Sequence, residues 1–456
     1  MEKEEKLKEE AKRISVKEGS FYNVMEGMGV RYITPYALSI GLSNSLIGFL
    51  AVFPTLIGNL LRISLNKFYY KNERKKIVLP FVFTQAFFWI PLILVGAAYF
   101  FLGLKLVTAS ILLIACYSVI IIAGVLASPA WTSWMQDLVE TNRGEYFSKR
   151  NRITGIFLLI SMLSAGLILD SFEGKNLFFG FAIIFCIASI GRHISFYFLK
   201  KQYEPKAVKD EKAYFSFFKF IKKMPSNNFG RFVIFVSITS FAVAIASPFF
   251  SVYMLKELNL SYFAFTIINL SSLISPIIFL PLIGKISDRF GTVRIMKLSG
   301  FLIAFVPLLW IFSIYLIKFN PIILVSYLFI IELFSGFVWA AFNLAHSNFI
   351  YDAVTKPKII LCFTYFSFLN AVGAFFGGVI GGQILNFTSL SLFGLNGILL
   401  VFLISFILRL VPSILIGSKL KEVRPVDKGP LAISFEIRQK FESLFGAISN
   451  YSSRPK

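Results

Sequence analysis

A short polar segment, residues 284–294, lies between two apolar runs and carries the spacing that most clearly suggests chemistry. It reads G-K-I-S-D-R-F-G-T-V-R, which sets an aspartate and two arginines among glycines: Gly284, Asp288, Arg289, Gly291 and Arg294. Charges beside a bilayer must be paired or hydrated, and glycines let backbones approach closely. A passive anchor needs neither the aspartate nor the glycines. We therefore expect a tight, charge-dense turn with a role beyond joining two spans.

Three further charges lie inside apolar runs: Glu26 and Arg31 in the first run and Glu332 in a later one. Isolated charges at such depth cost several kcal/mol, so they should face a cavity or one another. Glu26 or Glu332 could bind and release a proton, while Arg31 could hold an anionic group. The equal alternative is a structural ion pair of Arg31 with Glu26 or Glu332. The five-residue spacing does not favour pairing of Glu26 with Arg31 on one helix face.

A polar stripe follows Glu332 along the same run. Trp339, Asn343 and His346 come seven, eleven and fourteen residues after it, which keeps them near one helical face. We predict that this stripe forms a wall of a solute path. For His346 we expect a neutral, hydrogen-bonded role rather than proton relay.

Composition sets the environment of these residues. The chain has 456 residues, of which 56% are hydrophobic and 15% charged, and its mean hydropathy is +0.73. These values indicate an all-α, multi-pass integral membrane protein. The net charge of +22 is spread over alternate loops rather than gathered on one face, so no nucleic-acid partner is expected. The three cysteines have no ligand spacing, and neither a metal nor a cofactor is predicted.

Apolar runs of about 20 residues predict about twelve membrane-spanning helices. The predicted spans are Phe21–Leu42, Leu46–Leu65, Ile77–Phe101, Val107–Leu138, Ile153–Leu169, Leu177–Leu199, Phe232–Leu255, Phe263–Ile286, Ile295–Ile317, Pro321–Val354, Ile359–Leu385 and Leu392–Ile416. Lysines and arginines cluster after the second, fourth and eighth spans and before the seventh. This bias predicts that both termini lie in the cytoplasm, and the expected location is the plasma membrane.

The same reading predicts five regions: a tail at 1–20, a bundle at 21–199, a linker at 200–231, a bundle at 232–416 and a tail at 417–456. The linker and the second tail each contain an amphipathic segment, at 214–223 and 437–448. Aromatic and aliphatic side chains mixed with lysines suit helices on the surface of anionic lipid. Membrane lipids are therefore expected partners.

A weak internal repeat relates the two halves. Asp137 is followed six residues later by Arg143, and Asp352 is followed six residues later by Lys358, at an offset of 215. Pro35 and Pro248 lie at a similar offset. The first-half copy of the polar segment departs from the second, because it has Tyr70 and Glu73 in the places of Asp288 and Gly291.

The pattern G-x-x-x-D-R-x-G-x-x-R is similar to the signature loop of major facilitator superfamily transporters, and the segment 131–147 resembles a loop of many prokaryotic members. The resemblance covers Phe21 to about Ile416. It implies two pseudo-symmetric six-helix bundles with a site at the midplane between them. It also implies a cytoplasmic latch in which Asp288 meets the start of the eleventh helix near Lys358, with Asp137, Arg143 and Asp352 in the second gate loops.

The expected function is secondary active transport of a small solute by alternating access, coupled to H⁺, in a monomer. An ATP-driven pump is disfavoured because the chain has no phosphate-binding loop motif. One alternative is a transporter-like sensor or scaffold that does not cycle. Another is a membrane-embedded lipid-modifying enzyme, which two distant histidines and the lack of a nucleophile motif do not support, so no enzyme activity is expected.

The latch predicts that Asp288→Asn inserts normally but loses most of its transport. The substitution keeps the size of the side chain and removes the charge, while the cations that set orientation remain. Solute flux in proteoliposomes, normalised to inserted protein, measures the effect. Wild-type flux would mean that the loop sets only orientation and the turn.

Overall fold

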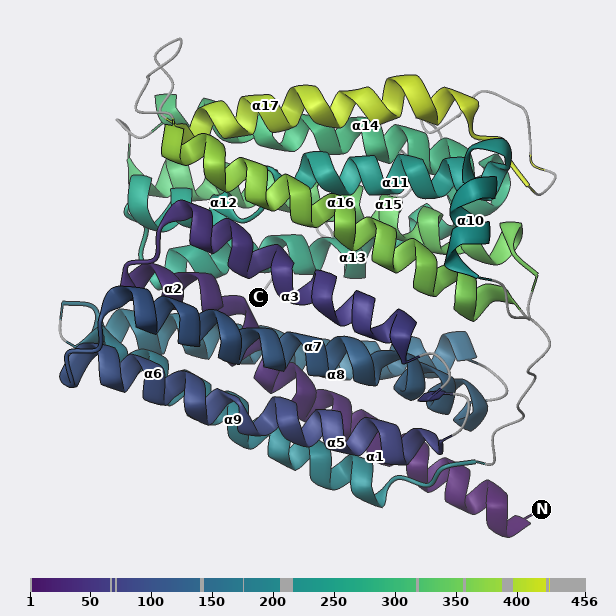
Figure 1. Ribbon diagram of the computed structural model, residues 1–456, viewed down its shortest axis with the longest axis horizontal. Coiled ribbons are helices and arrows are strands. Elements are labelled where there is room, and N and C mark those ends of the chain that lie inside the picture. Colours follow the sequence, from purple (N-terminus) through teal and green to yellow (C-terminus); the bar gives the residue numbers. More distant parts are fainter. Residues whose placement is uncertain are drawn as a thin grey trace, which may run out of the picture.

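The computed structural model shows long helices that run side by side (Figure 1). It describes residues 2–65, 68–69, 72–139, 143–174, 176–205, 216–316, 320–355, 358–387, 397–423 and 426. The helices are α1 (Glu2–Met28), α2 (Ile33–Ile40), α3 (Asn44–Ser64), α5 (Arg74–Phe87), α6 (Trp89–Phe101), α7 (Leu106–Leu138), α8 (Arg143–Phe172), α9 (Leu177–Lys201), α10 (Phe217–Lys223), α11 (Asn228–Ala244), α12 (Phe249–Val252), α13 (Tyr262–Phe290), α14 (Thr292–Ile311), α15 (Pro321–Ala353), α16 (Ile359–Phe387) and α17 (Gly397–Val411).

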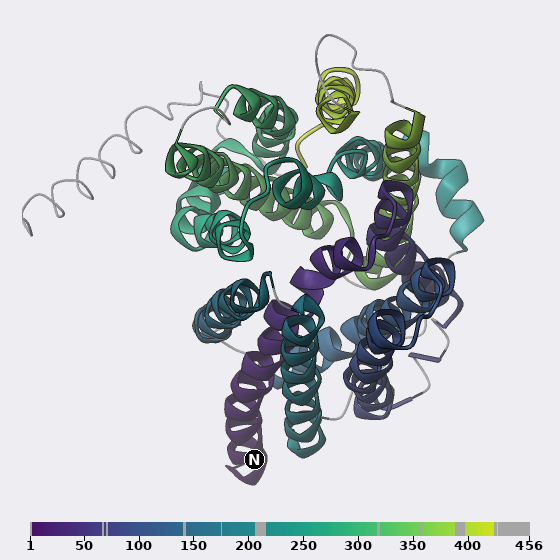
Figure 2. The ribbon, with the colours of Figure 1, turned by 90° about the vertical axis from the view of Figure 1, so that its left-hand side faces the viewer.

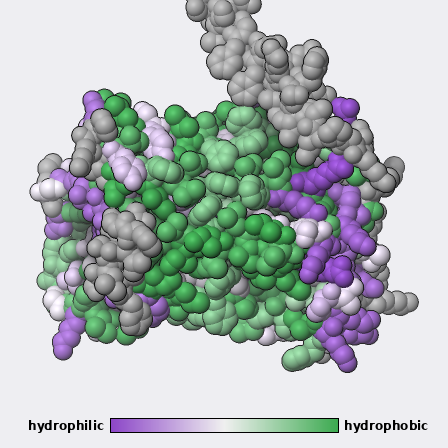
Figure 3. All heavy atoms as spheres, turned by 90° about the horizontal axis from the view of Figure 1, so that it is seen from above, coloured by the Kyte–Doolittle hydropathy of each residue, from purple (hydrophilic) through white to green (hydrophobic). Residues whose placement is uncertain are grey.

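Eleven segments of the described chain are long and apolar enough to cross a membrane. The broken pair α1 and α2 supplies the remaining span, so the predicted all-α membrane fold with about twelve spans is confirmed. On the face drawn in Figure 3, apolar side chains form a band between two hydrophilic ends. The predicted start of the last span and the amphipathic segment at 437–448 lie outside the described residues.

The first span is interrupted. Gly29 and a 3₁₀ turn at Val30–Tyr32 separate α1 from α2. Pro35 lies in the first turn of α2, where its missing N–H is tolerated. α1 also begins well before the predicted start at Phe21. Its residues 4–10 are mostly exposed, and Ala11 is the first of its side chains to pack against the end of α7. The break turns side chains after Gly29 away from the helical register of α1.

The helices form two bundles, α1 to α9 and α11 to α17, which are seen end-on in Figure 2. α3 packs against α7 of its own bundle and against α16 of the other, and α8 packs against α13. These two pairs are the principal contacts between the bundles. α10 lies against the end of α16, where Phe217 contacts Tyr365 and Phe368.

Glycines on α16 form two rows that face different bundles. Gly373, Gly377 and Gly381 face α11 of the same bundle, whereas Gly378 and Gly382 face α3 of the other. A methyl group added to Gly377 would overlap a backbone oxygen of α11, and one added to Gly382 would lie 2.8 Å from the backbone of α3. Small residues thus permit close packing within a bundle and between bundles.

The two halves share a capping device at one end. The Glu204 carboxylate, after α9, accepts hydrogen bonds from the backbone N–H groups of Arg74 and Lys75 at the start of α5. The Glu422 carboxylate, after α17, accepts one from Val293 N–H at the start of α14. A carboxylate at a helix N-terminus accepts hydrogen bonds from amides that have no partner within the helix, and its negative charge interacts favourably with the helix dipole. The two acids lie 218 residues apart, close to the offset of the predicted repeat.

The polar segment 284–294 is less of a loop than its sequence indicates. α13 continues to Phe290 and α14 begins at Thr292, so Gly291 alone joins them. Its φ of 102° lies in the region that favours glycine, because only a residue without Cβ adopts it easily. A single glycine can therefore reverse the chain, and the charges of the segment project from helix ends.

The two glycine rows predict different effects of added side chains. We expect Gly377→Val to lower thermal stability, by about 1–3 kcal/mol, because it overpacks α11 in every conformation. Gly382→Val should keep that stability but separate α3 from α16, which increases labelling of a cysteine introduced by Ser45→Cys. Gly155→Val is the control, since an added methyl group there meets nothing within 4 Å. Equal losses of stability at positions 377 and 382 would contradict the assignment.

Candidate functional site

The helices α5, α8 and α14 begin at the same end of the molecule, on the right in Figure 1. Arg74, Arg150 and Arg294 lie early in these helices, so this end is called the basic end and the opposite end the far end. A cavity of about 530 Å³, the largest of the three described below, lies toward the basic end and is partly open. Side chains of α1, α5, α7, α8 and α9 line it, and Leu273 and Ile277 of α13 complete the wall from the other bundle. The cavity therefore lies where the two bundles meet.

One carboxylate and two guanidinium groups form the charged side of this cavity. Arg150 Nη2 lies 3.3 Å from Glu18 Oε2, and Arg192 Nη1 lies 3.5 Å from Glu18 Oε1. Ser195 donates to the same carboxylate at 3.0 Å, and Arg192 Nε donates to Gln85 Oε1 at 2.8 Å. The five side chains come from four helices, α1, α5, α8 and α9, and the three charged groups are buried. With two cations and one anion, this group carries a net positive charge.

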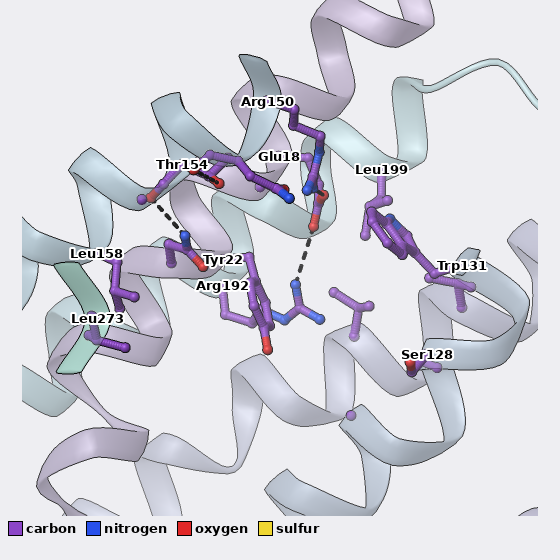
Figure 4. A pocket seen from close by; sticks show the side chains of 18 of the residues that line it. Glu18, Tyr22, Ser128, Trp131, Arg150, Thr154, Leu158, Arg192, Leu199 and Leu273 are labelled. Carbon is purple, nitrogen blue, oxygen red and sulfur yellow. Dashed lines mark hydrogen bonds and ion pairs between the residues drawn. The ribbon is translucent and has the colours of Figure 1, made fainter. Parts of the chain in front are cut away.

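Aromatic rings cover the two arginines on the cavity side (Figure 4). Arg150 lies 4.9 Å from the ring of Trp131, and Arg192 lies 4.8 Å from the ring of Tyr22. Such contacts stabilise a cation that has lost water. The opposite wall is mainly apolar, with Leu158 prominent in the figure. The cavity thus suits a solute with an apolar or ring-shaped part.

A second cavity, of about 430 Å³, lies between α3, α7 and α16. Thr55, Asn59 and Arg62 of α3 face Ser367 and Asn370 of α16 across it. Gly124 and Ser128 of α7 line both this cavity and the largest one. The two cavities therefore share a wall on α7.

A third cavity, of about 320 Å³, holds Glu26 and Arg31 beside α12 and α13 of the other bundle. Arg31 Nε lies 3.6 Å from Glu26 Oε1. The expectation that the five-residue spacing disfavours this pair was wrong. The spacing rule holds for a continuous helix, whereas the break at Gly29 and the 3₁₀ turn bring Arg31 back toward Glu26.

Hydrogen bonds join the two bundles at the far end. Ser45 Oγ of α3 donates to Gly382 O of α16 at 3.0 Å. The Asp170 carboxylate of α8 accepts from the backbone N–H groups of Tyr262 and Phe263, which begin α13, at 2.7 and 3.1 Å. These contacts close the far end, while the two larger cavities lie toward the basic end.

The polar stripe on α15, which begins at Glu332, does not line the three cavities described above. Glu332 accepts a hydrogen bond from Trp310 Nε1 of α14 at 3.2 Å, inside the C-terminal bundle. Trp339 and His346 contact the same phenylalanine ring of their own helix, and Asn343 is exposed. Among the described residues, these four are not in the lining of the three cavities. Their place on a solute path stays a prediction.

The gate residues gather at the basic end. Asp288 and Arg289 are exposed at the end of α13, one turn after Gly284, and Arg289 lies 5.2 Å from the ring of Phe290. Arg294 is half-buried in the first turn of α14. The latch that these residues are predicted to form stays a prediction.

The second gate loops occupy equivalent ends in the two halves. Asp137, at the end of α7, pairs with Arg74 of α5 within its own bundle. Asp352 lies in the last turn of α15, and Lys358 is exposed just before α16. Arg143 begins α8, but its side chain lies outside the described residues.

Sequence reasoning did not single out Glu18, Arg62, Arg150 or Arg192. Glu18 fell in the predicted tail, Arg150 was counted only among the basic residues that follow the fourth span, and Arg192 lies inside the predicted sixth span. Arg62 lies inside the predicted second span, where the rule applied to Glu26 would have found it. Their meeting depends on contacts across more than 100 residues, such as that of Glu18 with Arg150 at a separation of 132, which no local pattern reveals.

Comparison with known proteins agrees with this architecture. The family model described as Major Facilitator Superfamily matches residues 19–350 and 232–451. Similar solved structures include a point mutant of the nucleoside transporter NupG, with a TM-score of 0.65, 16% identity, and coverage of 91% of this chain and 100% of that one. A search of curated proteins finds no match.

Two further solved structures have the same fold. A bacterial homologue of the iron transporter ferroportin, in an inward-facing state, has a TM-score of 0.64 and 11% identity, and covers 91% of this chain and 98% of its own. A bacterial metal transporter has a TM-score of 0.56 and 12% identity, with the same coverage of both chains. At these identities the likeness concerns the fold alone.

The charged group of the largest cavity predicts the effect of Glu18→Gln. The substitution leaves two buried arginines without their shared anion, so we expect a loss of stability on the order of 3 kcal/mol. Thermal unfolding in detergent measures it, with the exposed Glu4→Gln on the same helix as control. Adding Arg150→Gln to Glu18→Gln should restore part of the loss. An unchanged unfolding temperature in Glu18→Gln would show that the ion pairs do not stabilise the bundle.

Proposed function

Because the chain belongs to the major facilitator superfamily and is a secondary transporter of a small solute rather than an enzyme, we propose that it works by alternating access coupled to protons. The observation that carries this proposal is the contrast between the two ends. Hydrogen bonds join the bundles at the far end, while the larger cavities between them lie toward the basic end. This arrangement fits one of the two states that alternating access requires.

The far-end contacts suit a gate that opens. Apart from the Asp170 carboxylate, they are single neutral hydrogen bonds, each contributing about 0.5–1.5 kcal/mol. Gly378 and Gly382 let α3 and α16 approach without interlocking side chains. Such a seam can part and form again at modest cost. Tyr32 and Thr266, which share a hydrogen bond, lie on the same boundary.

The charge distribution supports an orientation. Cations concentrate at the basic end, so the positive-inside rule assigns that end and both termini to the cytoplasm of the plasma membrane. The arrangement is then the inward-open state. The predicted latch of Asp288 would form at this end in the outward-open state. We also infer a monomer that contacts anionic lipid and binds no nucleic acid.

Proton coupling is supported by the pair of Glu26 and Arg31. The pair lies in a cavity at the boundary between the bundles, beside α12 and α13. Protonation of Glu26 would release Arg31 and change the charge of that boundary, which is a way to link proton binding to bundle movement. Glu332 is a second acid that could take part.

The solved relatives name two kinds of solute. A metal ion receives no support here, since the described residues contain no group of three or more His, Cys, Asp or Glu side chains that could hold one. A non-transporting sensor is the alternative. It would need no coupling acid, so the cavity-facing Glu26 favours a transporter.

Flux in proteoliposomes tests the proposal. A thermal-shift screen of sugars, amino acids, organic acids, nucleosides and lipids identifies a solute that stabilises the folded state. We expect uptake of that solute to depend on a pH gradient and to lose this dependence in Glu26→Gln, with Glu4→Gln as control. Uptake that ignores both the gradient and a protonophore would overturn proton coupling. A solute that binds but never crosses would favour a sensor.

A further inference from the structure

Resting on the proposed transport function, we propose that the solute is a small organic anion whose carboxylate or phosphate group binds Arg62. The site is the cavity between α3, α7 and α16. Arg62 is only 7% exposed, and its Nε and Nη2 atoms have no hydrogen-bond partner among the described residues. A buried guanidinium group without an anion is costly, so an anion from outside the chain is expected to complete it.

The other buried arginines show what the chain does when an arginine has a structural role. Arg74 pairs with Asp137 and Glu204, and Arg150 and Arg192 share Glu18. Arg409 donates to Ser405 Oγ and to the carbonyls of Ile303 and Val243. Each of these four has partners that fix its guanidinium group. Arg62 differs from all of them.

The surroundings of Arg62 favour an anion. The side chains that line its cavity include no acid among the described residues. Asn59 uses its amide N–H on Thr55 O, and Asn370 Oδ1 accepts from Ser240, which leaves the Asn370 amide N–H groups to donate into the cavity. A guanidinium fork with a neighbouring amide donor matches the oxygen atoms of a carboxylate or phosphate.

The adjoining cavity offers space for the part of such a solute that lies beyond its anionic group. Ser128 and Gly124 of α7 line both cavities, so the two cavities adjoin there, and the proposal places the body of a solute held at Arg62 on the side of Tyr22 and Trp131. The wall there is largely apolar, and the group formed by Glu18 and its two arginines carries a net positive charge. An anion with an apolar or aromatic body fits both features, whereas a cation would meet repulsion in both cavities.

The position of Arg62 also connects binding to movement. Its guanidinium group lies 5.9 Å from the ring centroid of Phe363 on α16, so it reaches the other bundle. An anion bound there contacts α3 and α16, the helices that touch between bundles. A ligand shifts a conformational equilibrium only if it binds the two states differently. A site made by both bundles meets that condition.

The test compares anions with neutral counterparts of the same shape. The purified full-length chain is titrated with benzoate against benzamide, gluconate against glucose, and uridine monophosphate against uridine, by thermal shift and calorimetry. We expect the anionic member of at least one pair to stabilise the protein and the neutral member to have no effect. The carboxylate pairs and the phosphate pair separate the two kinds of anion.

Three variants assign the effect to Arg62. We expect Arg62→Gln to weaken anion binding about tenfold or more and Arg62→Lys to keep part of it. Arg152→Gln removes the same charge from an exposed position of α8 at the basic end and should bind like the wild type. Without solute, Arg62→Gln should unfold at the wild-type temperature or higher, because it removes an unpaired buried charge. A marked loss of stability would reveal a structural partner and contradict the proposal.

The remaining outcomes separate this inference from the proposed transport. If no anion of the panel binds, or if a neutral solute binds and crosses equally well in wild type and Arg62→Gln, the inference fails while transport can stand. If anions bind through Arg62 but never cross the membrane in proteoliposomes, the site stands and the transport proposal fails.

Discussion

The structure depends on one constraint: a charged side chain removed from water must find partners. Arg74 meets this need by joining α5 to α7 and to the segment after α9. Arg192 joins α9 to α1 and α5, and Arg409 joins α17 to α11 and α14. Each link lies within one bundle, and removing one partner of a buried pair is strongly destabilising. Buried charge therefore makes each bundle a rigid unit.

Contacts between the bundles are of another kind. Glycines and single hydrogen bonds of uncharged side chains join α3 to α16, and the Asp170 carboxylate meets the backbone amides at the start of α13. These interactions involve no buried ion pair of two side chains. The difference in strength between the inside of a bundle and its boundary is what rigid-body rocking requires. The pair of Glu26 and Arg31 lies at that boundary, where a change of charge has the largest effect.

Sequence reasoning found the spans because hydropathy is a local property. The tenth predicted span, Pro321–Val354, differs from α15 by one residue. Sequence reasoning missed the break at Gly29, because glycine is tolerated in membrane helices and packing decides whether a helix bends at a glycine. Because this break was missed, the expectation that Glu26 and Arg31 would not pair was wrong. The partners of Glu18 come from α8 and α9, so its burial follows from tertiary structure rather than from the charged segment around it.

A comparison of equivalent positions in the two halves distinguishes residues that stabilise the fold from residues that face the cavities. Arg192 and Arg409 lie 217 residues apart, near the offset that relates Glu204 to Glu422. Arg409 bonds to a serine and two carbonyls inside its bundle, whereas Arg192 faces a carboxylate and a tyrosine ring on a cavity wall. Glu204 and Glu422 therefore have the same capping role in both halves, whereas Arg192 and Arg409 have different surroundings. The charged residues that line the three described cavities all belong to the N-terminal half. That half should therefore contribute the charged contacts with the solute, and the C-terminal half an uncharged part of the wall.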